Sequence, residues 1–137
     1  MKKFLLMIVL IAGVMSVSAQ SMYVSSEKRQ TCYWNEALSK FSGCGDIESY
    51  ESLFVLNGDA TIFTHTTSKI KSSYYVKDKT YNKEKDLTTY DVVSDVGNKY
   101  QFIIGDGAVN FVILSTGHAK SEDDYIIKFP IKRKWRD

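Results

Sequence analysis

The feature of this sequence that most constrains its fold is a two-residue alternation of apolar and other side chains near the C-terminus. In residues 125–132, every second position holds a large apolar side chain: Tyr125, Ile127, Phe129 and Ile131. Side chains alternate between the two faces of a β-strand, so this pattern predicts a strand with one buried face. Because Pro130 cannot donate a backbone hydrogen bond, we expect the strand to lie at an edge or to break there.

Turn-forming residues divide the preceding part of the chain into similar short segments. The turn signals are Asn57-Gly58-Asp59, Val96-Gly97-Asn98 and Gly105-Asp106-Gly107. Asn-Gly in particular suits the positive φ angles of a tight hairpin turn. The segments that they separate have strand-like composition, and the predicted strands are 50–56, 61–67, 87–94, 99–104 and 108–114.

Three further segments complete the predicted element list. Residues 73–77 predict a strand with 78–86 as its outgoing loop, and residues 22–33 predict one or two strands. Residues 35–41 allow a short helix capped by Asn35. The chain is therefore predicted to be all-β, with seven or eight strands in a single antiparallel meander. We expect the meander to form a closed or half-open, lipocalin-like barrel, with a β-sandwich as the alternative.

The N-terminus reads as a signal peptide over residues 1–19. Lys2 and Lys3 precede an apolar run, and small residues lead up to Ala19, after which cleavage is predicted. The apolar run is about 12 residues long, against the roughly 20 that span a bilayer, so no stable membrane anchor is expected after cleavage. Residues 20–137 are then a single β domain that is periplasmic or secreted.

Cleavage removes the net charge of the chain. The whole sequence has 18 Lys and Arg against 16 Asp and Glu, and Lys2 and Lys3 account for the excess of two. A chain with balanced charge has no general attraction to nucleic acid or to an anionic membrane, so neither is an expected partner.

Cys32 and Cys44 are the two cysteines of the chain. In an oxidising compartment such a pair forms a disulfide, which closes a loop of about a dozen residues and is worth about 3 kcal/mol. The glycines at 43 and 45 allow a sharp turn beside Cys44. The alternative is a redox or metal pair, but the spacing is not Cys-x-x-Cys and no third ligand is nearby.

No catalytic motif, metal site or cofactor site is predicted. A Gly-x-Ser-x-Gly elbow is absent, and His65 and His118 give no basis for a shared metal site. The acidic run 122–124 lacks the alternating oxygens of a calcium loop and is expected to be a solvated loop. His65 lies on the same strand face as Phe63 and is expected to be partly buried and hydrogen-bonded to a neighbour.

Aromatic residues are the best candidates for a binding site, because a small barrel can hold a ligand inside or at its mouth. Aromatic side chains that could line such a site include Tyr74 and Phe102. The residues selected as ligand-binding candidates are Trp34, His65, Tyr75, Tyr90 and Tyr100. Simple packing in the core is the alternative role for these aromatic side chains.

One part of the sequence resembles a known group. The segments 63–67, 70–72, 74–77 and 89–100 are similar to those of small exported bacterial β proteins without assigned activity. The resemblance implies export and a compact β fold, and it carries no catalytic residues. The meander also resembles lipocalin-like barrels in topology alone, since the Gly-x-Trp motif of lipocalins is missing and Trp34 follows Cys32-Tyr33.

These observations predict a non-enzymatic binding module that recognises a small apolar ligand or a protein surface. The first alternative is an inhibitor or interaction protein that docks through an edge strand or through residues 69–85. The second is a hydrolase of unrecognised type, in which His65 works with Asp91 or Asp95 from neighbouring strands. Oligomeric state is not predicted by any feature of the chain.

Overall fold

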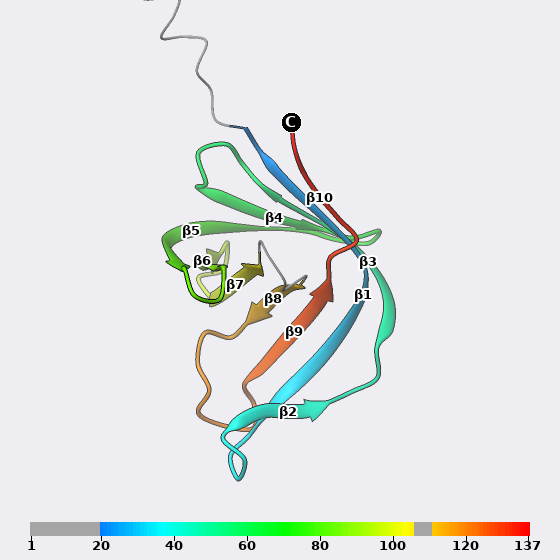
Figure 1. Ribbon diagram of the computed structural model, residues 1–137, viewed down its shortest axis with the longest axis vertical. Coiled ribbons are helices and arrows are strands. Elements are labelled where there is room, and N and C mark those ends of the chain that lie inside the picture. Colours follow the sequence, from blue (N-terminus) through cyan, green and yellow to red (C-terminus); the bar gives the residue numbers. More distant parts are fainter. Residues whose placement is uncertain (1–19, 106–110) are drawn as a thin grey trace, which may run out of the picture.

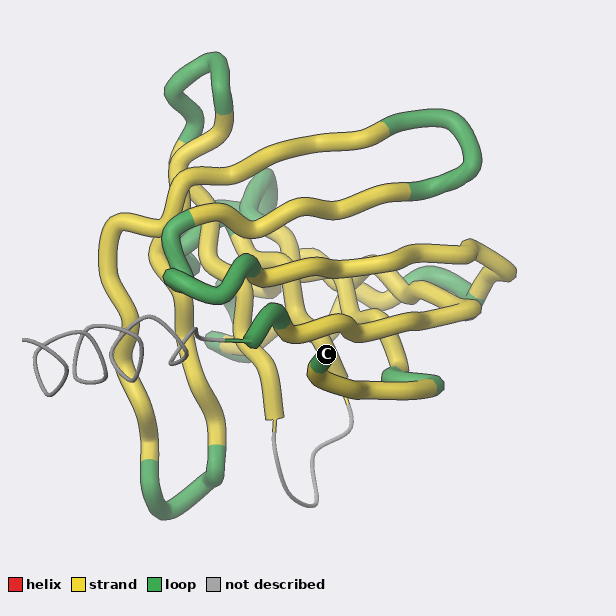
Figure 2. The backbone as a smooth tube through the Cα atoms, turned by 90° about the horizontal axis from the view of Figure 1, so that it is seen from above, coloured by secondary structure: helices red, strands yellow, loops and turns green. Residues whose placement is uncertain are grey.

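The computed structural model describes residues 20–105 and 111–137, which form ten β-strands and no helix (Figures 1 and 2). The strands are β1 (Met22–Asn35), β2 (Lys40–Cys44), β3 (Glu48–Leu56), β4 (Ile62–Thr66), β5 (Lys71–Asn82), β6 (Leu87–Ser94), β7 (Lys99–Gly105), β8 (Phe111–Ser115), β9 (Tyr125–Pro130) and β10 (Arg133–Arg136). The predicted signal peptide and most of the predicted turn at 105–107 lie outside the described residues.

The strands form one antiparallel sheet that closes on itself. Its order is β10-β1-β3-β4-β5-β6-β7-β8-β9, and β9 also pairs with β1. The result is an eight-stranded meander barrel, with β2 and β10 as two additional strands that pair with β1. This confirms the predicted all-β meander and selects the closed barrel over the half-open barrel and the β-sandwich.

The long strand β1 closes the barrel because its two halves have different partners. Its first half pairs with β3 and β10, and its second half pairs with β9 and β2. The pair Tyr33–Tyr125 and the pair Ser25–Arg133 are eight residues apart in both strands, so β9 and β10 continue one register along β1. The predicted break at Pro130 therefore occurs, but β9 is not an edge strand, because it pairs with β8 and β1.

The predicted helix over residues 35–41 is wrong. This segment is the turn of the β1–β2 hairpin, in which the side-chain carbonyl of Asn35 accepts a hydrogen bond from the backbone N–H of Leu38 at 3.0 Å. The rings of Trp34 and Phe41 pack edge to face across the hairpin, with centroids 5.1 Å apart. Cross-strand packing and the disulfide thus override the helical spacing of the local sequence.

Two other local predictions need correction. Residues 78–82 are not loop but the exposed second half of β5, where the backbone pairs with β6 and neither face reaches the core. In the β3–β4 connection the positive φ belongs to Ala60 (55°), whereas Asn57 accepts hydrogen bonds from the backbone N–H groups of Thr61 and Ile62. The turn at Gly97 does have the expected positive φ, 87°.

Aromatic and aliphatic side chains fill the barrel. Phe54 contacts Phe63, Phe102 and Phe129 at ring-centroid distances of 5.0–6.1 Å, and all four rings are at most 1% exposed. The other buried hydrophobic residues of this cluster are Met22, Val24, Leu56, Tyr90, Val92, Ile104, Val112 and Leu114. Such packing makes the barrel interior a core rather than a channel.

The described residues contain no helix that is long and apolar enough to cross a membrane.

Candidate functional site

Five of the nine tyrosines of the chain lie at one end of the barrel. Tyr50, Tyr74, Tyr100 and Tyr125 stand near the start of β3, β5, β7 and β9, and Tyr33 stands near the end of β1. Successive strands of a meander run in opposite directions, so the starts of these odd-numbered strands and the end of β1 meet at the same mouth. We call this mouth the tyrosine end.

The alternation of each strand turns these rings toward the barrel axis. Tyr50 shares a face with the buried Phe54, and Tyr100 shares a face with the buried Phe102. Tyr125 shares a face with the buried Phe129, and Tyr33 is its direct cross-strand partner. Tyr74 packs against Phe102 with centroids 5.0 Å apart. Each tyrosine therefore lies in a layer above the filled core.

Four of these tyrosines form two ring pairs at this mouth. The rings of Tyr74 and Tyr100 meet edge to face at 5.8 Å, and those of Tyr33 and Tyr125 meet at 6.1 Å. Burial, followed by the nearby Tyr100 hydroxyl, raises the pKa of both Tyr74 and Tyr125. Both phenols are neutral at physiological pH, as an ordinary tyrosine is, so they can donate and accept hydrogen bonds.

The hydroxyl groups of these tyrosines are available to a ligand. Tyr33 is 48% exposed, and Tyr50, Tyr74, Tyr100 and Tyr125 are partly buried. Among the described residues, the hydroxyls of Tyr50, Tyr100 and Tyr125 have no hydrogen-bond partner in the protein. The mouth thus combines apolar ring faces with free polar groups.

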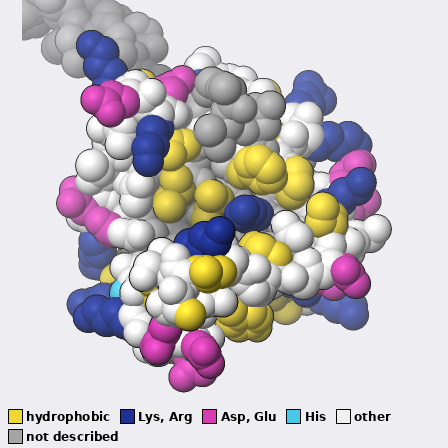
Figure 3. Space-filling model, turned by 60° about the horizontal axis from the view of Figure 1, so that its bottom comes forward, with side chains coloured by type: hydrophobic (Ala, Val, Ile, Leu, Met, Phe, Trp, Pro, Cys, Tyr) yellow, Lys and Arg dark blue, Asp and Glu magenta, His cyan; other side chains and the backbone are white. Residues whose placement is uncertain are grey.

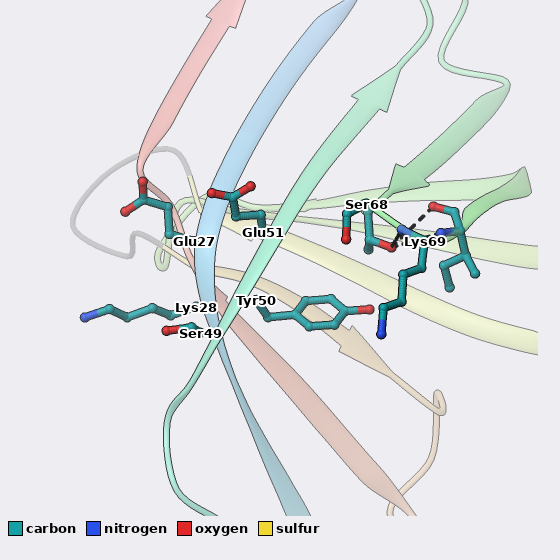
Figure 4. A pocket seen from close by; sticks show the side chains of 9 residues that line it. Glu27, Lys28, Ser49, Tyr50, Glu51, Ser68 and Lys69 are labelled. Carbon is teal, nitrogen blue, oxygen red and sulfur yellow. Dashed lines mark hydrogen bonds between the residues drawn. The ribbon is translucent and has the colours of Figure 1, made fainter.

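Tyr50 connects the tyrosine end to a cation and to a cavity of about 600 Å³. The guanidinium of Arg29 lies 3.7 Å from the centre of the Tyr50 ring and also pairs with Glu48. In Figure 4 the Tyr50 ring points toward the side of Ser68 and Lys69, while Glu27 and Glu51 lie on the other side of β3. The cavity is open to the surface and mixes apolar and charged side chains.

His65 and Ser52 form a buried polar pair beneath this end. The His65 Nε2 atom lies 2.8 Å from the Ser52 hydroxyl, and the two residues are 7% and 6% exposed. The imidazole also stacks on Phe54 at a centroid distance of 4.4 Å. Burial, aided by the charge of Arg29, lowers the pKa of His65 to about 4, so the ring is neutral at physiological pH.

The proposed pairing of His65 with Asp91 is wrong. His65 points into the barrel, whereas Asp91 alternates with the buried Tyr90 and Val92 and so points outward. Its carboxylate accepts a hydrogen bond from Gln101 on the neighbouring strand at 2.7 Å. Asp95 lies in the exposed β6–β7 turn and makes no hydrogen bond with His65.

The structure separates the sequence-based binding candidates. Tyr100 belongs to the tyrosine end, His65 is buried beneath it, and Trp34 lies beside Tyr33, packed on Phe41. Tyr75 is on the outer surface and 49% exposed, and Tyr90 is a core residue, 5% exposed. The adjacent tyrosines 74 and 75 illustrate the cause, since neighbouring strand residues face opposite sides of the sheet.

Sequence reasoning missed Tyr33, Tyr50, Tyr125 and Arg29. The signal that could have found Tyr50 and Tyr125 is positional, because each stands two residues before the next inward-facing side chain at a strand start, as the predicted Tyr100 does. Tyr33 could not be found this way. Its face depends on the irregular pairing of β1 with β3 between Ser26 and Lys28.

The acidic run 122–124 contains a second organised group. Asp124 was expected to be solvated, but it is 4% exposed and accepts hydrogen bonds from the backbone N–H groups of Lys120 and Ser121. His118 pairs with the same carboxylate, with Nδ1 2.6 Å from Oδ1. Together these bonds, led by that of Lys120, lower the pKa of Asp124 to about 2.

The loop that Asp124 organises borders an outer groove of about 400 Å³. The groove lies over β6 and β7, and its lining includes the outward-facing Val93, Lys99 and Gln101. On the face of the molecule shown in Figure 3, hydrophobic side chains lie in several groups with Lys and Arg side chains among them. This face therefore combines apolar side chains with positively charged ones.

Within residues 20–105 and 111–137, no group of three or more His, Cys, Asp or Glu side chains is arranged to hold a metal ion. The Cys32 and Cys44 sulfurs form a disulfide bond in the structure, with an S–S distance of 2.05 Å. The two cysteines are direct cross-strand partners in β1 and β2, which explains how a pair twelve residues apart can be joined.

Comparison of the chain with protein-family models, with curated proteins and with solved structures found no match. The fold therefore defines the class of the protein: an eight-stranded antiparallel β-barrel with two additional strands.

Proposed function

We propose that this chain is an exported, non-enzymatic binding module that recognises its ligand at the tyrosine end of the barrel. The observation that carries the proposal is the convergence of five tyrosines at one mouth, above a core that is already filled. The ligand is then a small apolar molecule with polar groups, or a group of that kind on a protein surface.

The chemistry of tyrosine suits such a role. A phenol ring provides a large apolar face with few rotatable bonds, and its hydroxyl adds a hydrogen bond at the rim. Arg29 adds a cation beside Tyr50, which favours a ligand with an acceptor or an anionic group at that side. The mouth can thus hold the apolar part of a ligand and orient its polar part.

The filled interior argues against carriage of a long apolar chain. Lipocalin-like barrels, which this meander resembles in topology, can enclose one small ligand when eight strands leave space inside. Here Phe54, Phe63, Phe102 and Phe129 occupy that space. Recognition at the mouth is therefore better supported than transport inside the barrel.

Export is the other part of the proposal. The signal-like residues 1–19 and a disulfide between Cys32 and Cys44 both fit an oxidising compartment, periplasmic or extracellular. Sequencing the N-terminus of the protein recovered after export tests this part, and the expected first residue is Gln20. A retained Met1 would contradict it.

A hydrolase based on His65 is less well supported. The Ser52–His65 pair is buried, and the contacts of its imidazole are Ser52, Phe54 and Phe129 rather than a carboxylate that would orient a catalytic base. Docking through an edge strand remains a second candidate, because none of the described strands pairs with the outer side of β2.

The binding proposal is tested with three probes: oleate, a chito-oligosaccharide and a library of short peptides. NMR shift mapping on the exported protein should place the response of the best probe at Tyr33, Tyr100 and Tyr125. Tyr100→Phe should weaken this binding several-fold, because it removes a free hydroxyl. Tyr75→Phe is the matched control, because Tyr75 lies on the outer surface.

Two results would contradict the proposal. One is stoichiometric binding of oleate with its shifts centred on Phe54 and Phe102, which would mean that the core opens to carry lipid. The other is binding of the probes with no NMR shift at the tyrosines of the tyrosine end. Chemical turnover of a probe by the wild-type protein that is lost in Ser52→Ala would also contradict the proposal.

A further inference from the structure

Strand β2 (Lys40–Cys44) presents an open edge. It pairs with β1 on one side, and no strand of the described residues pairs with its other side. Gly43 pairs with Tyr33, and the N–H of Gly45 bonds to the carbonyl of Thr31, so the backbone groups of the intervening Cys44 point away from β1. Figure 1 shows β2 at the bottom of the molecule, with its outer side facing away from the barrel.

Two exposed apolar side chains mark the ends of this edge. Leu38 lies just before β2 and is 58% exposed, and Ile47 lies just after it and is 61% exposed. A charge accompanies each of them, Lys40 at the first end and Asp46 at the second, and neither forms an ion pair within residues 20–105 and 111–137. Glu36, in the same turn as Leu38, is also exposed, so Lys40 is the charge on the strand itself while the turn before it is acidic.

We propose that β2 is a self-association edge, which pairs antiparallel with β2 of a second copy of this chain. Antiparallel pairing of the two β2 strands brings the Leu38 and Lys40 end of one copy toward the Asp46 and Ile47 end of the other. Both ends of the interface then contain one apolar contact and one pair of opposite charges. This is the isologous arrangement of a twofold dimer.

The part of β2 that could pair regularly with a second strand is short. The register of β1 with β2 shifts between Tyr33 and Trp34, so the regular pairing around Cys44 consists of Cys32 with Cys44 and Tyr33 with Gly43. The interface is short, so we expect a weak dimer that dissociates in the micromolar range, on the order of 10 μM. The inference does not depend on the ligand proposed for the tyrosine end.

The test is the mass of the exported protein in solution, measured by sedimentation over a concentration range up to the millimolar. The wild-type protein should shift from monomer to dimer. Lys40→Glu sets two acidic side chains together at both ends of the interface, and should weaken the dimer roughly tenfold or more. The double variant Lys40→Glu/Asp46→Lys reverses both charges and should restore it.

Leu38→Asp tests the apolar contact and should also weaken the dimer. Val96→Asp is its matched control, because Val96 is a 77% exposed residue of the β6–β7 turn, and it should leave the mass unchanged. If circular dichroism shows that Lys40→Glu is unfolded, Asp46→Lys is used instead, because it sets two basic side chains together at both ends of the interface. A protein that stays monomeric to the millimolar range overturns the proposal. So does a dimer that neither charge reversal nor Leu38→Asp affects.

Discussion

Among the strands of residues 20–105 and 111–137, β2 and β10 are short and pair with β1 alone, and their open edges differ in charge. β10 (Arg133–Arg136) and its approach carry Lys132, Arg133, Lys134 and Arg136. β2 carries one charge, Lys40, and two glycines lie within or directly after it. Unpaired backbone groups on a strand invite another strand, and clustered lysine and arginine charges discourage it.

Side-chain packing also separates the two edges. On β10, Trp135 stacks on Tyr23 at 5.4 Å and the Arg133 guanidinium lies 5.0 Å from the Trp135 ring centre. β2 is held by the Cys32–Cys44 disulfide and by Phe41 against Trp34. A like-charged edge repels its own copy, so β10 resists self-pairing. A covalently fixed, nearly neutral edge can meet a partner with little loss of conformational entropy.

The largest expected effect comes from removing the covalent fixation of β2. Cys32→Ser with Cys44→Ser should lower the free energy of unfolding by about 3 kcal/mol, since it releases the loop constraint on the unfolded chain. Urea unfolding followed by tyrosine fluorescence measures this. Reduction of the wild-type protein should produce the same loss. Equal stability of the reduced and oxidised proteins would show that the disulfide does not fix β2.

The second effect concerns the core that both edges share. The pKa of His65 is lowered to about 4 in the folded protein, against about 6.5 in the unfolded chain, so the unfolded state binds more protons between these pH values. Stability should therefore be full above pH 6.5 and fall toward pH 4, by at most about 3 kcal/mol.

His65→Gln is the comparison variant for that pH dependence, and it should flatten the stability profile between pH 4 and 6.5 in urea titrations. Asp124 acts in a separate window, because its lowered pKa of about 2 removes stability as the pH falls below about 3.8. An unchanged slope in His65→Gln between pH 4 and 6.5 would assign the acid sensitivity to other groups.

A smaller effect is expected at β10. Trp135→Ala removes the stacked ring from Tyr23 and Arg133, and should cost about 1–2 kcal/mol of unfolding free energy. Hydrogen exchange should show faster exchange in β10 and not in β2. Equal acceleration in both strands would show that the two edges are coupled through β1 rather than independently held.

The smallest change in stability is expected for variants that test whether positive charge keeps β10 from pairing with a second copy. Arg133→Thr with Arg136→Thr, made in the Lys40→Glu background, removes two charges from the β10 edge and should alter unfolding free energy by less than about 1 kcal/mol. Sedimentation should then detect new, weak self-association through β10. A monomeric result would mean that charge is not what protects this edge.

Much of the barrel could be predicted because its signals are local. The alternation in residues 125–132 and the turn at Gly97 each depend on a few neighbouring residues. The first predicts β9, and the second predicts the boundary between β6 and β7. The disulfide was also predictable, since its two cysteines are the only ones in the chain. The exposed half of β5 was missed, because polar residues 78–82 form a strand by pairing with β6 rather than by burial.

The candidate site was less predictable than the fold. Tyr74 and Tyr75 are adjacent and chemically identical, and the sequence has no feature that says which of them faces inward. Tyr33 reaches the mouth because the pairing of β1 and β3 shifts between Ser26 and Lys28, and this changes the face of the residues that follow. A one-residue shift of this kind moves every later side chain to the other side of the sheet.

The sequence by itself determined an all-β chain with a cysteine pair and turns at defined places, because alternation and turn chemistry act over a few residues. The tertiary structure alone decided that β1 would close the barrel, that five tyrosines would meet at one mouth, and that β2 would be left with an open edge. These features join residues that are far apart in the sequence, such as Tyr33 and Tyr125 or Ser25 and Arg133. Their meeting depends on strand register and closure, which no local pattern specifies.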